Sequence, residues 1–93
     1  DPRGVAVDEE GVIYVASAGS QTIQRYTAEG EVLTPIGAPG GRAAVGAWDG
    51  RGFWHLRGVA VDRRGNVWAC EEDFTKRLSR WNRDGQLLGE FFG

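Results

Sequence analysis

The residues best able to do chemistry gather at Cys70-Glu71-Glu72-Asp73, and the sequence holds one histidine, His55. A thiol, an imidazole and carboxylates are the ligand types that hold zinc and related metals. However, no Cys or His recurs at metal-ligand spacing, and adjacent carboxylates on an extended chain point to opposite faces. We therefore predict no catalytic residue, no metal site and no cofactor. We expect solvated loop acids that pair with basic neighbours, namely Lys76, Arg77 or Arg80.

A second group of candidate residues lies in and around the Gly-rich segment 38–57. Arginine can hold anions or carboxylates, tryptophan can stack on sugars or rings, and loops on a rigid scaffold often carry binding. The candidate ligand-binding residues are Arg3, Trp48, Asp49, Arg51, Trp54, His55 and Arg57. The alternative interpretation is structural, with the aromatic side chains Trp48, Phe53 and Trp54 filling the gap between two packed units.

An internal repeat must position these residues. Arg3-Gly-Val-Ala-Val-Asp8 recurs without change as residues 57–62, and each copy has a Gly three residues after its Asp, at Gly11 and Gly65. An Asp at a turn start and a Gly that takes positive φ form a tight turn, so we interpret Asp8, Gly11, Asp62 and Gly65 as structural turn residues. A fixed repeat of this length is typical of solenoids and propellers.

Each copy contains four short apolar segments separated by turn signals, which predicts a four-stranded antiparallel meander. The chain has 15 glycines, is 41% hydrophobic and shows no sustained helical periodicity. The predicted strands lie near residues 5–7, 13–16, 22–26 and 32–36 in the first copy, and near 59–61, 67–70, 77–81 and 87–92 in the second. We expect Cys70 to pack between sheets, as its counterpart Ala16 does.

The first copy resembles the NHL repeat family. The matching residues are Pro2, Gly4, Val5, Ala6, Val7, Asp8, Gly11, Ile13, Tyr14, Val15, Ala16, Ile23, Gln24 and Tyr26. The second copy has Leu56 where the family has Pro, and the usual Asp after the second strand is Ser17 in one copy and Glu71 in the other. The resemblance implies a β-propeller of bacterial type, commonly with six blades, and the Gly-rich segment 38–57 looks similar to the connections between such blades.

The predicted fold is therefore all-β, with two four-stranded antiparallel propeller blades in one chain. The first NHL-like blade spans residues 1–37, the connection spans 38–57, and the second blade spans 58–93. Two blades cover one pair of sheet faces and leave two faces bare, whereas closed propellers have about four to eight blades. Both blades look complete, so we expect three copies to close head to tail into a six-bladed homotrimer.

Charge is distributed unevenly along the chain. Residues 1–37 carry six acids and two bases, whereas residues 38–93 carry seven acids and nine bases. Copies meeting head to tail would therefore bring an acidic half against a basic half. The basic residues of the second blade would need to gather on one face to bind RNA, and the acidic blade would interrupt them, so nucleic acid is not an expected partner.

The predicted function is that of a non-enzymatic, self-assembling scaffold that binds a protein, glycan or small molecule. Two alternatives follow from the resemblance: a piece of a larger propeller with metal-dependent activity like that of lyases or lactonases, or an RNA-binding propeller. No apolar run is long enough to cross a bilayer, so we expect a soluble protein with no membrane partner. The sequence does not give the compartment, and an extracytoplasmic parent protein is one option.

Overall fold

The computed structural model describes residues 2–37, 52–53, 55–72 and 76–92, without the side chains of Pro2 and Arg3. It contains two four-stranded antiparallel sheets, each a simple meander in chain order. The first blade consists of β1 (Pro2–Val7), β2 (Ile13–Ser17), β3 (Thr22–Tyr26) and β4 (Val32–Ile36). The second blade consists of β5 (Leu56–Val61), β6 (Val67–Glu71), β7 (Arg77–Trp81) and β8 (Leu87–Phe92).

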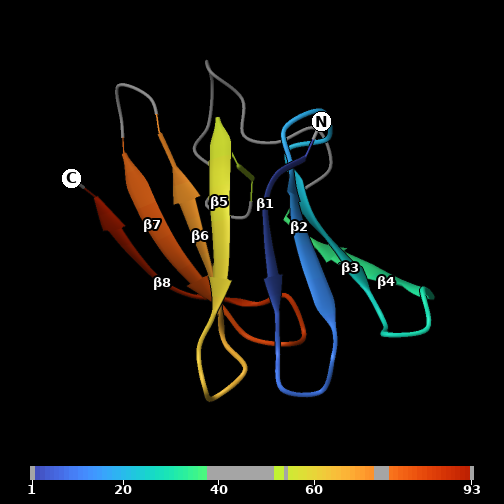
Figure 1. Cartoon of the computed structure of the whole chain (residues 1–93). Helices are drawn as coiled ribbons and strands as arrows, with labels where there is room; N and C mark the ends of the chain where they lie inside the picture. Colours follow the sequence, from blue (N-terminus) through green and yellow to red (C-terminus); the bar gives the residue numbers. More distant parts are fainter. Residues whose placement is uncertain (1, 38–51, 54, 73–75, 93) are drawn as a thin grey trace.

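The two blades fan out from their first strands, so that β1 and β5 lie side by side and β4 and β8 lie farthest apart (Figure 1). β1 and β5 begin three residues earlier than the sequence predicted, at Pro2 and Leu56, because each crosses a pairing irregularity and continues to pair with the end of the neighbouring strand. The other six predicted strands agree with the observed ones to within a residue. The structure is thus all-β and propeller-like.

Glycine allows the close approach of the two first strands. A Cβ placed on Gly4 would lie 3.3 Å from the Cα of Gly58 and 3.5 Å from the backbone nitrogen of Val59. A side chain at Gly4 would therefore press on the β5 backbone and force the two strands apart. In contrast, a Cβ on Gly58 would meet only the Cβ of Cys70, at 4.0 Å.

One apolar core lies between the facing sides of the two blades. Cross-strand pairing places Tyr14, Ala16, Ile23 and Ile36 on one side of the first blade, and all four are buried. The same cluster contains apolar side chains of the second blade and of the segment before β5: Phe53, Leu56, Val67, Ala69 and Trp81. Phe53 contacts Trp81 with ring centroids 5.2 Å apart, so Phe53 fills space between the blades. Trp48 and Trp54 lie outside the described residues.

The turns after β1 and β5 are built in the same way. The carboxylate of Asp8 accepts hydrogen bonds from the backbone nitrogens of Glu10 and Val12 and from the Tyr14 hydroxyl, at 2.9–3.0 Å. Gly11, which has a φ of 86°, donates to the Asp8 carbonyl. The carboxylate therefore accepts backbone donors that the tight turn leaves unpaired.

Asp62 repeats this arrangement, accepting from the backbone nitrogens of Arg64 and Asn66 and from the indole Nε1 of Trp68 at 3.1 Å. The positive φ recurs at Gly65 (82°). Two turns of different sequence, Glu-Glu in one and Arg-Arg in the other, thus keep the same hydrogen-bond geometry.

The hydrogen bond from Trp68 is the main reason that the pKa of Asp62 lies below its ordinary value. A carboxyl whose folded-state pKa is lowered contributes stability above its unfolded-state pKa and loses it as pH falls through the folded-state pKa. We predict that NMR titration will show Asp62 ionised at pH values where a free Asp is protonated. Trp68→Phe should raise this pKa toward the ordinary value, and an unchanged pKa in that variant would contradict the assignment.

Candidate functional site

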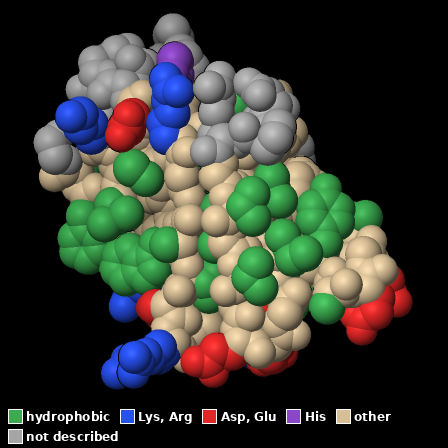
Figure 2. Space-filling view, in the orientation of Figure 1, with side chains coloured by type: hydrophobic (Ala, Val, Ile, Leu, Met, Phe, Trp, Pro, Cys, Tyr) green, Lys and Arg blue, Asp and Glu red, His purple; other side chains and the backbone are tan. Residues whose placement is uncertain are grey.

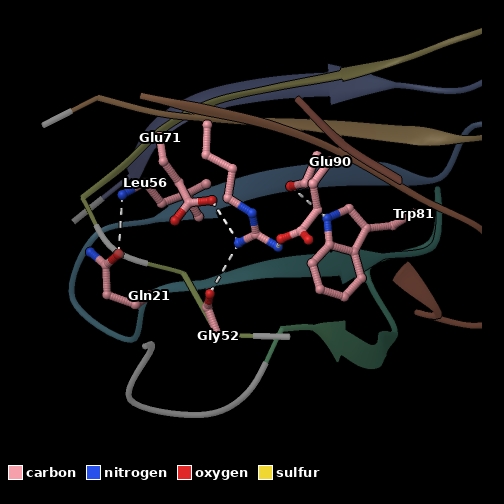
Figure 3. A network of polar contacts seen from close by, with 8 residues as sticks. Gln21, Gly52, Leu56, Glu71, Trp81 and Glu90 are labelled. Carbon is pink, nitrogen blue, oxygen red and sulfur yellow. Dashed lines mark hydrogen bonds and ion pairs between the residues drawn. The ribbon is translucent and has the colours of Figure 1, made fainter. Parts of the chain in front are cut away.

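Arg77 is the centre of a buried polar network at one end of the second blade. It pairs directly across the strands with Glu71, and both residues are buried. Its Nη1 donates to Glu71 Oε2 at 2.8 Å and to the carbonyl of Gly52 at 3.2 Å (Figure 3). Its Nη2 forms an ion pair with Glu90 Oε1 at 2.8 Å. One guanidinium thus joins β6, β7, β8 and the segment before β5.

Next to this network, the second blade has a hollow of about 360 Å³. Its walls combine apolar side chains with charged groups of both signs: Cys70, Glu71, Glu72, Lys76, Arg77, Leu78, Phe91 and Phe92. Such a mixture suits a ligand or partner that is largely apolar and carries a few polar groups.

Cys70 lines this hollow as a free thiol. Burial raises its pKa, and the negative charges of Glu72 and Glu71 raise it further. Because the thiolate is the nucleophile, this environment makes Cys70 a poor nucleophile at neutral pH.

A smaller hollow of about 130 Å³ lies where the first blade meets the start of β5. It is lined by Ala18, Gln21, His55, Leu56 and Arg57. Gln21 and His55 both have a φ of 53°, in the left-handed region. Gln21 Oε1 accepts a hydrogen bond from the backbone nitrogen of Leu56 at 3.0 Å (Figure 3), and the His55 carbonyl accepts one from Glu72 at 3.1 Å.

The structure brings together two of the predicted ligand-binding residues, since His55 and Arg57 are exposed and line the smaller hollow. Arg3 lies on β1 at the position equivalent to Arg57 on β5, and its side chain is not described. Trp48, Asp49, Arg51 and Trp54 lie outside the described residues. The binding role of this set therefore stays a prediction.

Two expectations for the acidic cluster were wrong. Glu71 is not a solvated loop acid, because β6 continues through it and turns its side chain to the buried face, where Arg77 pairs with it. Cys70 does not pack between the two sheets as Ala16 does. It points to the opposite, open side of the second blade and is only partly buried. Asp73 lies outside the described residues.

Sequence reasoning expected an acid of this cluster to pair with Arg77, but it missed that the Glu71–Arg77 pair is buried. The repeat itself carried a signal, since the equivalent residues of the first blade are Ser17 and Thr22, which also pair across the strands. An acid and a base replacing two small polar residues at paired positions indicate a local ion pair. The Gly52 carbonyl comes from the segment before β5, which lies outside the paired strands.

The basic residues of the second blade do not form one surface. Arg77 is buried, Arg57 and Lys76 belong to the hollows at one end, and Arg63 and Arg64 lie in the turn after β5. Blue side chains accordingly appear at opposite ends of the molecule in Figure 2.

The described part of the chain holds no group of three His, Cys, Asp or Glu residues placed to bind a metal ion. Nor do the described residues form a helix long and apolar enough to cross a membrane.

Comparisons with known proteins support the fold. No family model matches the chain, and no curated protein matches it. Among solved structures, a protein of unknown function from Bacteroides caccae is similar, with 18% identity and a TM-score of 0.67 over 99% of this chain and 28% of its own. Virginiamycin B lyase from Staphylococcus aureus, a β-propeller, is similar with 16% identity and a TM-score of 0.64 over 97% of this chain and 26% of its own. This chain thus spans about a quarter of each neighbour and shares their fold.

We predict that Glu71→Ala lowers the free energy of unfolding by about 3 kcal/mol, because it removes an acceptor from a buried guanidinium. Glu72→Ala is the matched control. The Glu72 side chain is exposed, so this substitution should change the free energy of unfolding by no more than about 0.5 kcal/mol. Urea unfolding followed by tryptophan fluorescence measures both. Equal effects of the two substitutions would contradict the assigned role of Glu71.

The raised pKa of Cys70 gives a second prediction. Its alkylation by iodoacetamide should accelerate at higher pH than that of an ordinary thiol, because the thiolate forms later. Glu72→Ala should shift this rate profile to lower pH by removing a nearby negative charge. A profile that matches a free cysteine, unaffected by Glu72→Ala, would show that the thiol does not experience this environment.

Proposed function

We propose that this chain is a non-enzymatic, self-assembling β-propeller scaffold of NHL type, in which three copies join head to tail into a six-bladed ring. The observation that carries the proposal is that each open face of the chain is the repeat equivalent of a face already buried between its two blades. We call the packed interface between the two blades the joint. The chain would carry both of the faces that form a joint, so copies could form the same joint between molecules.

The buried joint defines the two complementary faces. The first blade contributes the side of Tyr14, Ala16, Ile23, Arg25 and Ile36. The second blade contributes the opposite side of its sheet, which contains Val59, Val61, Val67, Ala69, Trp81 and Leu87. Different sides of two equivalent sheets thus pack on each other.

The open face of the first blade carries the equivalents of the second blade's buried side. Val5, Val7 and Val32 correspond to Val59, Val61 and Leu87. They are 62%, 59% and 70% exposed, whereas their three counterparts pack against the core. The exposure shows that apolar side chains are in place without the sheet that would cover them.

The open face of the second blade carries the equivalents of the first blade's buried side. Leu78 and Phe91 correspond to Ile23 and Ile36, and Trp68 and Cys70 correspond to Tyr14 and Ala16. Phe91 stacks on Trp68 with centroids 6.2 Å apart and is 58% exposed. Figure 2 shows separate apolar groups over β1–β2 and over β7–β8. Exposed patches of this kind mark interaction surfaces.

The charges near the open faces support a second copy of the chain as the partner that covers them. At the exposed edge where the two blades of the chain meet, Glu10 of the first blade forms an ion pair with Arg83 of the second at 2.6 Å. The equivalent turns at a joint between copies carry Arg63 and Arg64 on one side and Glu29 on the other, with all three side chains exposed. The signs are reversed but still opposite, so the same approach of the two turns remains attractive.

A head-to-tail interface closes into a ring when its rotation divides a full turn. Three copies would supply six blades, within the usual range for propellers. The ring would then present Arg57 and His55 three times around one end of its channel, as donors suited to carboxylates or other anions. This end is the proposed ligand-binding surface of the scaffold.

Sedimentation equilibrium of the 93-residue chain tests the proposal. We expect a species of three times the chain mass. A chain that stays monomeric at every concentration would contradict self-assembly and assign the open faces to further blades of a longer polypeptide.

Two glycine variants separate assembly from folding. Gly58→Val adds a side chain whose Cβ meets only the Cβ of Cys70 within the chain, but in a repeated joint this Cβ would meet the β1 backbone of the next copy. We therefore predict a folded monomer. Gly4→Val places its side chain against Gly58 within the same chain, so it should destabilise the blade pair itself. A Gly58→Val chain that still forms trimers would contradict the repeated joint.

A further inference from the structure

Arg25 joins the two blades through backbone carbonyls. Its Nε donates to the carbonyl of Thr34 in its own blade at 2.7 Å, and its Nη1 donates to the carbonyl of Arg83 in the second blade. The side chain is almost fully buried. A guanidinium buried at the joint is tolerated because carbonyl oxygens accept hydrogen bonds from its N–H groups.

Arg80 is the equivalent residue of the second blade. It pairs with Trp68 across the strands, as Arg25 pairs with Tyr14. Its guanidinium lies over the Trp68 ring, 5.7 Å from the centroid. Its Nε is buried and has no hydrogen-bond partner among the described residues. On the open face of the second blade, Arg80 Nε therefore lacks an acceptor like the Thr34 carbonyl that Arg25 Nε has in its own blade.

A shift in the β-bulge explains why Arg80 finds no acceptor within its own blade. In the first blade the pairing irregularity lies between Ile23 and Arg25, next to Thr34 and Pro35 of β4. In the second blade it lies one position further along, between Arg80 and Trp81. Arg80 consequently pairs in regular register with Gly89, without the bulged strand that offers Arg25 the Thr34 carbonyl.

We propose that Arg80 donates a hydrogen bond to the backbone carbonyl of Ala28 in a second copy of this chain. This inference rests on the proposed head-to-tail ring and names a contact that fixes its register. Ala28 occupies the position in the first blade that Arg83 occupies in the second. Where Arg25 reaches the Arg83 carbonyl inside one chain, Arg80 reaches the Ala28 carbonyl between chains.

The two acceptor turns have the same backbone geometry. In the turn after β3, Gly30 donates to the Thr27 carbonyl at 2.9 Å and Thr27 donates to Glu31 at 2.9 Å. In the turn after β7, Gly85 donates to Asn82 at 3.1 Å and Asn82 donates to Gln86 at 3.0 Å. Gly30 and Gly85 share a positive φ, 91° and 80°. The Ala28 carbonyl therefore holds the same place in its turn as the Arg83 carbonyl.

Apolar packing alone is non-directional, so two open faces could slide along each other. A guanidinium that must reach one carbonyl permits a single register, because any other leaves the buried cation without its acceptor. The contact also places Arg63 and Arg64 near the acidic turn at Glu29.

Arg80→Leu tests the contact, with Arg25→Leu as the matched variant inside the chain. Because hydrogen bonds from charged donors are stronger than neutral ones, Arg80→Leu should weaken association at each joint about tenfold or more in sedimentation equilibrium. The unfolding of its dissociated chain should be nearly unchanged. Arg25→Leu should instead lower the free energy of unfolding of the dissociated chain.

The ¹³C carbonyl resonance of Ala28 provides a direct readout. It should shift when the wild-type chain assembles and should not shift in the remaining assembled fraction of Arg80→Leu. If the ring forms but neither association nor this resonance responds to Arg80→Leu, the Arg80 contact is wrong and the ring stands. If the wild-type chain never assembles, both proposals fail.

Discussion

A blade of this kind is a sheet with two apolar sides, and each side must be covered by another sheet. All other features of the chain depend on that constraint. The two blades satisfy it once, through the core that contains Tyr14, Ile23 and Trp81. The remaining two sides keep the residue pattern of a covered surface, as the exposed Val5 and Phe91 show. The two outer sides of the blade pair therefore present apolar side chains of the kind that are buried between the blades.

The repeat made most of the fold predictable from the sequence. Identical Arg-Gly-Val-Ala-Val-Asp segments fixed the positions of β1 and β5, and the Gly11 and Gly65 turns fixed the strands that follow. Because successive side chains of a strand point to opposite faces, the sequence also indicated which residues share a face of each sheet. The lengths of β1 and β5 were less predictable, because pairing at Pro2 and Leu56 depends on a bulge and on the ends of β2 and β6 rather than on local pattern.

The candidate site was harder to predict from the sequence because it depends on contacts between distant segments. Glu71 looked like one acid in an exposed cluster, and only the extension of β6 reveals that its contact with Arg77 is buried. The Gly52 carbonyl reaches the same guanidinium from 25 residues away. Arg25 and Arg80 occupy equivalent positions, but a bulge displaced by one register step gives only Arg25 an acceptor in its own blade. No local sequence pattern encodes that displacement.

The most direct test of the account is an isotope-filtered NOE experiment on a mixture of labelled and unlabelled chains. Within the chain, Gly85 of the second blade lies close to Ile36 of the first, since a Cβ added to Gly85 would be 3.9 Å from Ile36 Cγ1. At a joint between copies, the residues in the equivalent positions are Gly30 of one copy and Phe91 of the other. The account predicts NOEs from the Phe91 ring of one copy to the Gly30 α-protons of another. Contacts of the Phe91 ring with any other surface, or none between copies in an assembled sample, would contradict it.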